Sequence, residues 1–312
     1  MKTLKLKMVV LLALLPLATG VASADTEYGY SRMFVFGASF LDSGNNFAVT
    51  GETAHPPFDP MSFTSYGIGG HHYSNGRTWV EVMAQEMDLT EWAKPAYRDP
   101  AYGNYAYGYA RARDVTYATG PGLGEQVQAW IDNGYCTGIP MDDTLFVLDS
   151  TYYDFGDILA GEDPMDILGG MLDSIATNIG ILYGCGARNL LVANAPPLGA
   201  SPMIPEADKA AATGLTWQYN VYVQSILGIY AGEPFYMNIS TFDIFTFFTA
   251  VMAAPEAFGL TNVTETCVTF GVLKDAFCKN RDEYFFWDSL HPTKKTHALM
   301  AEVALGQLPV PD

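Results

Sequence analysis

The sequence predicts an α/β fold with a mainly parallel sheet that is covered by helices on both faces. Short apolar runs rich in aromatic and β-branched residues alternate with segments of helical periodicity, which is typical of this class. The expected strands cover residues 33–36, 145–148, 190–193 and, more weakly, 234–237. The expected helices cover residues 78–87, 122–131, 164–183, 205–230, 242–252 and 292–305, where Pro292 suits a first helical turn. Since no repeat or linker interrupts the pattern, residues 25–312 are expected to form one domain.

Composition and charge exclude several classes of protein. The chain has 312 residues, of which 49% are hydrophobic, so it can fill a core. Aromatic residues make up 13% of it, which excludes intrinsic disorder. There are 34 acidic and 16 basic residues, and a net charge of −18 argues against a nucleic-acid partner, which requires basic surface.

Two stretches, 44–76 and 88–121, show no periodicity, and irregular segments of such length inside a domain are usually functional.

Residues 1–24 have the features of a cleaved secretory signal. A start with three lysines precedes the apolar residues 8–18, and Ala22-Ser23-Ala24 forms a small-x-small cleavage site before Asp25. The weaker alternative is a membrane anchor, because spanning a bilayer takes roughly 20 apolar residues. We therefore expect a secreted or periplasmic protein with no stable membrane insertion. Removal of three lysines and no acidic residue changes the net charge from −18 to −21.

Four cysteines in an exported chain predict two disulfides. They are Cys136, Cys185, Cys267 and Cys278, for which three pairings are possible. Cys267 and Cys278 are favoured as a local pair that closes a small loop, which leaves Cys136 to pair with Cys185. A zinc site is the weaker alternative, because the chain has neither a CxxC motif nor histidines at zinc-finger spacing.

Two motifs carry groups suited to catalysis. Ser39 comes directly after the first expected strand, at the carboxyl edge of the sheet, where open α/β sheets bind ligands. Asp288 and His291 are three residues apart, so that the carboxylate can accept a hydrogen bond from the imidazole, fix its tautomer and stabilise its protonated form. The alternatives are an exposed turn for Ser39, and a helix-capping aspartate beside a structural histidine.

Together these motifs resemble the GDSL, or SGNH, family of serine esterases and lipases, in its secreted, lecithinase/haemolysin-like branch. The first family block is matched by Gly37 to Asn45, with Ala38 in place of the usual aspartate, and the last block is matched without change by Asp288 to Thr293. Residues 73–77 and 194–199 also resemble stretches of this branch. The order and spacing of the blocks agree from about residue 31 to 305.

The resemblance implies a three-layer α/β/α sandwich with about five parallel strands. It implies that Ser39 is the nucleophile, His291 the general base and acid, and Asp288 its orienting partner. A serine hydroxyl is a weak nucleophile at neutral pH and needs such a base. The family uses neither a metal nor another cofactor, and it acts on carboxylic esters of small molecules or lipids through an acyl-enzyme that water releases.

The resemblance is weakest at the oxyanion hole, the group of donors that stabilises the negative oxygen of the intermediate. The backbone N–H groups of Ser39 and Gly108 are the expected donors, although Tyr109 stands where a second glycine is frequent and the assignment can shift by one. Tyr153 occupies the position of the family asparagine, and only Asp154 survives from that block. Since loss of one donor costs about 100- to 1000-fold in turnover, we expect weakened or altered catalysis.

Two other functions stay open from the sequence. One is a ligand-binding relative that keeps the fold without catalysis, and the other is an acyltransferase that uses the same triad with an alcohol in place of water. Of the remaining histidines, the pair His71-His72 is expected in a surface turn or a substrate loop, and His55 and His297 are expected to be structural. Tyrosines between 102 and 117 line a pocket or pack in the core.

Overall fold

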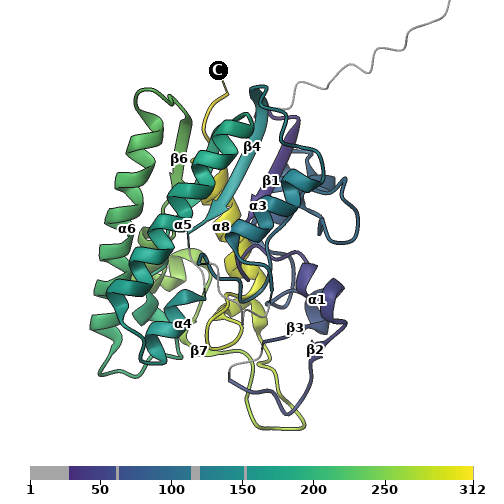
Figure 1. The fold of residues 1–312 in the computed structure, drawn as a ribbon. Helices are drawn as coiled ribbons and strands as arrows, with labels where there is room; N and C mark the ends of the chain where they lie inside the picture. Colours follow the sequence, from purple (N-terminus) through teal and green to yellow (C-terminus); the bar gives the residue numbers. More distant parts are fainter. Residues whose placement is uncertain (1–27, 61–62, 114–119, 151–152, 312) are drawn as a thin grey trace, which may run out of the picture.

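The computed structural model describes residues 28–60, 63–113, 120–150 and 153–311 (Figure 1), so the expected signal at residues 1–24 lies outside the described residues. The central sheet has four strands, all parallel, in the order β1-β4-β5-β6. Their bounds are Arg32–Phe36 for β1, Met141–Asp149 for β4, Ala187–Ala193 for β5 and Asn238–Phe242 for β6.

Helices cover both faces of this sheet, which confirms the predicted α/β/α class. One layer holds α3 (Leu123–Asp132), α5 (Pro164–Cys185) and α6 (Lys209–Ala231), and the other holds α2 (Trp79–Glu86), α7 (Ile244–Ala253) and α8 (Lys294–Leu305). Side chains alternate along each strand. Phe34 and Phe36 of β1 therefore pack against the first layer, whereas Met33 and Val35 pack against the second.

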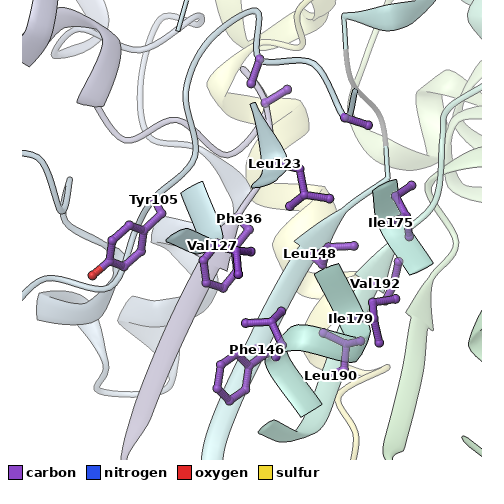
Figure 2. Packing of buried hydrophobic residues seen from close by; sticks show 14 of the residues in the cluster. Phe36, Tyr105, Leu123, Val127, Phe146, Leu148, Ile175, Ile179, Leu190 and Val192 are labelled. Carbon is purple, nitrogen blue, oxygen red and sulfur yellow. The ribbon is translucent and has the colours of Figure 1, made fainter. Parts of the chain in front are cut away.

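Figure 2 shows how the first layer is packed. Phe36, Phe146 and Leu148 project from β1 and β4 toward α3 and α5, which contribute Val127 and Ile179 among others. All of these side chains are buried. This packing fixes the carboxyl ends of the strands, from which the site residues emerge.

The structure differs from the expected elements in four places. The prediction of a weak strand at 234–237 is wrong. Phe235 and Tyr236 both donate their backbone N–H groups to the Gly232 carbonyl and form a turn, and strand β6 begins only at Asn238. Two helices begin later than expected, α6 at Lys209 and α8 at Lys294. In place of a fifth strand, Val35 pairs through a single bridge with Asn104 in the described part of the chain.

The remaining elements of the described residues are short. They are α1 (Asn45–Thr50), β2 (Thr53–Ala54), β3 (Ser65–Tyr66), α4 (Asp154–Leu159), β7 (Asn262–Thr266), β8 (Tyr284–Phe286) and five 3-10 helices, η1 (Gly67–Gly69), η2 (Thr90–Ala93), η3 (Leu198–Ala200), η4 (Pro255–Phe258) and η5 (Arg281–Glu283). Five of them, α1, β2, β3, η1 and η2, lie in the stretches without periodicity. The disulfides join Cys136 to Cys185 and Cys267 to Cys278, which confirms the predicted pairing.

One helix among the described residues, α5, is long and apolar enough by length and composition to cross a membrane. Its Ile167, Met171, Ile175 and Ile179 are buried against the sheet and the neighbouring helices. Helices of a soluble core pass the same test of length and composition, and 39% of the apolar window of α5 is buried inside the structure.

A buried ion pair ties the loop after β3 to α2. The Nδ1 atom of His72 donates to the Gly69 carbonyl at 2.7 Å, and its Nε2 atom lies 2.8 Å from Glu81 Oε2. Glu81 in turn accepts the backbone N–H of Thr78 at 2.8 Å and so caps α2. The expectation of a surface turn is therefore wrong for His72, whose ring is buried between the loop and the helix.

Protonation of this pair depends on pH in a defined direction. Burial lowers the pKa of His72, but the hydrogen bond and the charge of Glu81 outweigh burial and hold it above its usual range. Burial raises the pKa of Glu81, and His72 outweighs that effect and holds it below its usual range. His297, which accepts the backbone N–H of Trp79, stays neutral because burial lowers its pKa to about 3.

We expect His72→Gln to destabilise the protein most between about pH 4.5 and 6.5. The raised pKa of His72 contributes stability that is fully present at pH values below the pKa of histidine in the unfolded chain. This stability is lost as the pH rises through the pKa of His72 in the folded protein. The lowered pKa of Glu81 contributes stability above its unfolded value, which is lost as the pH falls. Breaking a buried pair costs about 3–5 kcal/mol. Urea unfolding at several pH values measures the effect; His55→Gln, at an exposed histidine, is the control. A penalty for His72→Gln that is constant from acid to alkaline pH would contradict this assignment.

Candidate active site

Ser39, His291 and Asp288 meet at the carboxyl edge of the sheet in the arrangement of a catalytic triad. His291 Nε2 lies 2.8 Å from Ser39 Oγ, and His291 Nδ1 lies 2.9 Å from each oxygen of Asp288. Because a carboxylate only accepts, Nδ1 carries the proton and Nε2 accepts from the serine hydroxyl. Residues 252 positions apart in the sequence are therefore in hydrogen-bond contact.

The turn that carries Ser39 requires glycine at position 37. A Cβ atom on Gly37 would lie 2.6 Å from the Cβ of Asp149, which is too close for any side chain. The amide of Gln126 bonds both backbone groups of Gly37, accepting its N–H at 2.9 Å and donating to its carbonyl at 3.0 Å. After Gly37 the chain makes one helical turn, in which Leu41 and Asp42 donate to the Ala38 carbonyl. Sheet and helix α3 thus fix the serine together.

Asp288 is buried and is held ionised by the groups around it. Besides the His291 ring, it accepts the backbone N–H groups of Leu290 at 2.9 Å and His291 at 2.7 Å. The hydroxyl of Tyr66 donates to its other oxygen at 3.0 Å. Burial raises the pKa of Asp288, but the His291 ring and these backbone donors outweigh burial and hold that pKa below its usual range. The expectation of a carboxylate that orients the imidazole agrees with this geometry.

The structure contradicts the expectation that Gly108 supplies an oxyanion donor. Its backbone N–H is directed at the carboxylate of Asp42, with a distance of 2.8 Å to Oδ2. Asp42 also accepts from the N–H groups of Gly44, Asn45 and Asn46, so its oxygens hold two loops together. Glycine is needed at position 108 for space, since a Cβ atom there would lie 2.0–2.2 Å from the ring of Tyr73.

Tyr109, the next residue, lines the pocket together with Ser39. Its backbone is left-handed, with a φ of 59°, a conformation that a glycine adopts more readily. Its ring lies 6.1 Å from the His291 ring, and the ring of Tyr73 lies 5.2 Å from the same imidazole. Of the tyrosine-rich segment, Tyr109 therefore reaches the site, while Tyr105 and Tyr107 belong to the core.

Tyr153 also lines this pocket, and its neighbours fix the orientation of its ring. The ring packs edge-on against Tyr109 at 4.9 Å, and the Arg111 guanidinium lies 5.0 Å from its centre. A Cβ atom on Gly156 would lie 2.8 Å from the ring, so position 156 has no room for a side chain. Burial raises the pKa of Tyr153, and its hydroxyl therefore keeps its proton at neutral pH.

Asp154, the residue of the divergent block that matches the family pattern, has a structural role. It accepts the Ala112 backbone N–H and the Arg113 Nε–H, each at 2.6 Å. Arg111 binds Asp157 through two parallel bonds of 2.9 and 2.7 Å, and Arg113 also pairs with Asp157. Two arginines and two aspartates thus fix α4 against the loop that carries Tyr109.

The cavity next to Ser39 has a volume of about 540 Å³ and a mainly apolar wall. It extends from the serine between α4, η3 and the start of α6. Its apolar lining comes from Phe40, Phe155, Leu159, Leu198, Met203, Ile204 and Leu290. Asp149 and Asp208 are its acidic residues. Such a cavity accepts an apolar group whose reacting end lies at Ser39 Oγ.

Sequence reasoning missed three residues that support this site: Gln126, Tyr66 and Tyr73. Gln126 lies in helix α3 among apolar residues of its buried face. A polar residue at such a position was the only sign in the sequence that it has a special role. Tyr66 and Tyr73 lie in a stretch without periodicity, which gave no signal of their contacts. No group of three or more His, Cys, Asp or Glu side chains among the described residues could hold a metal ion.

Comparisons with known proteins show the family to which the chain belongs. A family model described as GDSL-like lipase/acylhydrolase matches residues 33–304. The thermolabile hemolysin of Vibrio parahaemolyticus is 25% identical over 293 residues, which cover 88% of this chain but only 63% of that protein. The GDSL esterase/lipase EXL2 of Arabidopsis thaliana is 24% identical, with 86% of each chain covered. A solved GDSL-like lipase from Parabacteroides merdae covers 89% of this chain and 95% of its own, at a TM-score of 0.47 and 11% identity. The family match spans most of the sequence, and the chain therefore belongs to the GDSL-like lipase/acylhydrolase family.

Proposed function

We propose that this protein hydrolyses carboxylic esters through an acyl-enzyme on Ser39. The contact of 2.8 Å between Ser39 Oγ and His291 Nε2 is the observation that carries the proposal. Family membership supports an ester hydrolase in general, and the paired geometry supports Ser39 as the nucleophile. A relative that only binds ligands would have no need of a buried imidazole aligned between a hydroxyl and a carboxylate.

In the first half of the reaction, Ser39 Oγ attacks the carbonyl carbon of the ester while His291 Nε2 takes the hydroxyl proton. Asp288 stabilises the imidazolium that forms, through the bond to Nδ1. The tetrahedral intermediate then collapses, the bond to the alcohol oxygen breaks, and His291 gives its proton to the departing alcohol. The acyl group stays attached to Ser39.

In the second half, water replaces the alcohol. His291 removes a proton from the water as its oxygen attacks the acyl carbon, and a second tetrahedral intermediate forms. Its collapse releases the carboxylic acid and returns the proton to Ser39 Oγ. An acyltransferase would use an alcohol at this step, with the same proton transfers.

The oxyanion hole differs from the one expected from the sequence. We assign its donors to the backbone N–H of Ser39, the backbone N–H of Tyr109 and the hydroxyl of Tyr153. Since the Gly108 N–H binds Asp42, the second backbone donor shifts by one residue to Tyr109, which lines the pocket beside Ser39. Tyr153 lines the same pocket and carries a protonated hydroxyl, so it is suited to replace the asparagine amide.

The cavity favours esters with an apolar acyl group, including lipid esters. Each buried CH₂ group stabilises binding by about 0.8 kcal/mol, and a mainly apolar wall gives that gain to a hydrocarbon chain. We also propose that the protein is exported. Two disulfides fit an oxidising compartment, and the basic and apolar residues of 1–24 fit a signal segment.

We expect Ser39→Ala to lower turnover of a short p-nitrophenyl ester by about 10⁴-fold or more, because the nucleophile is lost while the fold is kept. Ser43→Ala, a buried serine in the same loop, is the matched control and should retain activity. A fluorophosphonate probe should label the folded wild type and fail to label Ser39→Ala. If Ser39→Ala hydrolyses the ester at the wild-type rate, another residue is the nucleophile. If the folded wild type is neither labelled nor active on the ester, the protein is a binding relative.

We expect Tyr153→Phe to lower kcat about 100-fold with little change in KM, because the ring is kept and the donor hydroxyl is lost. Tyr153→Asn restores the family side chain and should retain more activity than Tyr153→Phe. Steady-state kinetics on the same ester, with unfolding curves to verify the fold, measure both variants. Equal kcat values for wild type and Tyr153→Phe would contradict the assignment of the hydroxyl as a donor. Tyr153 would then only line the pocket.

A further inference from the structure

The outer face of α6 carries no charge. Residues 210–232 include no Asp, Glu, Lys, Arg or His, although the protein as a whole has a net charge of −18. Large apolar side chains of α6 are exposed in its middle and near its end: Trp217 at 59%, Val221 at 46%, Tyr222 at 43% and Ile229 at 59%. The first three lie closest to the cavity that contains Ser39. Trp217 and Val221 are four residues apart and lie on one face of the helix. Tyr222 lines an open surface hollow together with both of them. We call these three residues the α6 surface.

The opposite face of the same helix already packs in the core. Tyr219, Val223 and Leu227 are buried against the sheet and α5. In Figure 1, α6 forms one flank of the molecule with α5 beside it, and Tyr230 of α6 bonds the Ala176 carbonyl of α5. A surface helix usually turns a charged face to water, and a contiguous apolar patch marks an interaction site.

The α6 surface adjoins the cavity that contains Ser39. Asp208, at the start of α6, and Thr216, on its inner face, line that cavity. Trp217 follows Thr216 directly and points to the outside, where open hollows lie on both sides of its ring. Leu159 of α4 lines the cavity and is itself partly exposed to solvent. The first turns of α6 are thus the wall between the cavity and the patch.

The residue types of the α6 surface and the charge of the protein indicate which kind of partner binds there. Tryptophan and tyrosine are the residues that prefer the level of lipid headgroups, where one end of the ring is apolar and the other is hydrated. Lys209, the cation beside the patch, lines a hollow with Trp217 but is paired with Glu206 at 2.8 Å, so it offers little attraction to an anionic surface. The net negative charge of the protein would be repelled by such a surface. We propose that the α6 surface docks the protein on a lipid–water interface of zwitterionic or uncharged lipid; its use in catalysis rests on the proposed ester hydrolysis.

Binding can be measured without any catalysis, on the Ser39→Ala protein with phosphatidylcholine vesicles. Trp79, Trp130 and Trp287 are fully buried, and Trp92 is partly buried and packs against the core. The part of the emission change that is lost in Trp217→Gln therefore reports on Trp217. We expect a blue shift of the emission with these vesicles and a much smaller one with phosphatidylglycerol vesicles. Trp217→Gln combined with Tyr222→Gln should weaken co-sedimentation with phosphatidylcholine vesicles by about tenfold or more.

Ile139→Gln is the matched control, because Ile139 is 68% exposed and directly precedes β4, at the amino end of the strands, away from Ser39. It should bind vesicles as well as the parent. Unchanged vesicle binding by the Trp217/Tyr222 variant would overturn the proposal. So would light scattering that shows a dimer dissociated by Trp217→Gln, since the occupant would then be a second copy of the chain.

A second readout separates this proposal from the ester hydrolase itself. In the active protein, the Trp217/Tyr222 variant should lower the ratio of vesicle-borne to soluble ester hydrolysis by about tenfold. An unchanged ratio would contradict docking through α6. If neither ester is hydrolysed by wild type, the proposed function fails, while vesicle binding by Ser39→Ala would still support the docking surface.

Discussion

The active site depends above all on the buried carboxylate of Asp42. Four backbone N–H groups point at its two oxygens, three from residues 44–46 and one from Gly108. A carboxylate accepts such bonds strongly because it is charged, and in a buried setting no water competes for them. The Ser39 turn and the loop that carries Tyr109 are thereby held at a fixed separation, which decides where an ester carbonyl can lie between them.

This constraint explains why the glycine of the second block cannot have the role expected from the sequence. An N–H bound to a buried carboxylate is not available to an oxyanion, and the ring of Tyr73 fills the space where a side chain would stand. Asn45 strengthens the same junction, since its side chain donates to the carbonyls of Asn104 and Ala106. These bonds hold the loop in place up to Gly108. Under the proposed function, Tyr109 and Tyr153, which lie beyond it, supply donors together with Ser39.

The sequence was sufficient for the class of fold, which follows from local patterns, and the three residues proposed as a triad lie in hydrogen-bond contact. Apolar runs locate the strands at 33–36, 145–148 and 190–193, and Ser39 and His291 each lie in a short motif of their own. The oxyanion hole was not predictable in the same way, since the partner of an N–H group depends on which loops meet. Tyr66 shows this limit well: its bond to Asp288 joins residues 222 positions apart and lies in a stretch without periodicity. The turn at 234–237 was misread because Pro234, Phe235 and Tyr236 look apolar, while turn formation is decided by backbone bonds to Gly232.

The distribution of charge links the pocket to its surroundings. The basic side chains beside the pocket wall are each paired with carboxylates: Arg111 with Asp157, Arg113 with Asp154, and Lys209 with Glu206. These ion pairs hold α4 and the start of α6 in place. Because the carboxylates neutralise the cations, the cations add little attraction for an anionic substrate. With a strongly negative protein around it, the pocket must gain affinity from buried apolar area. The uncharged middle of α6 lies next to this apolar cavity, so both offer hydrocarbon contacts in place of charged ones. The proposed hydrolysis of apolar esters and the proposed docking on lipid rest on this shared property.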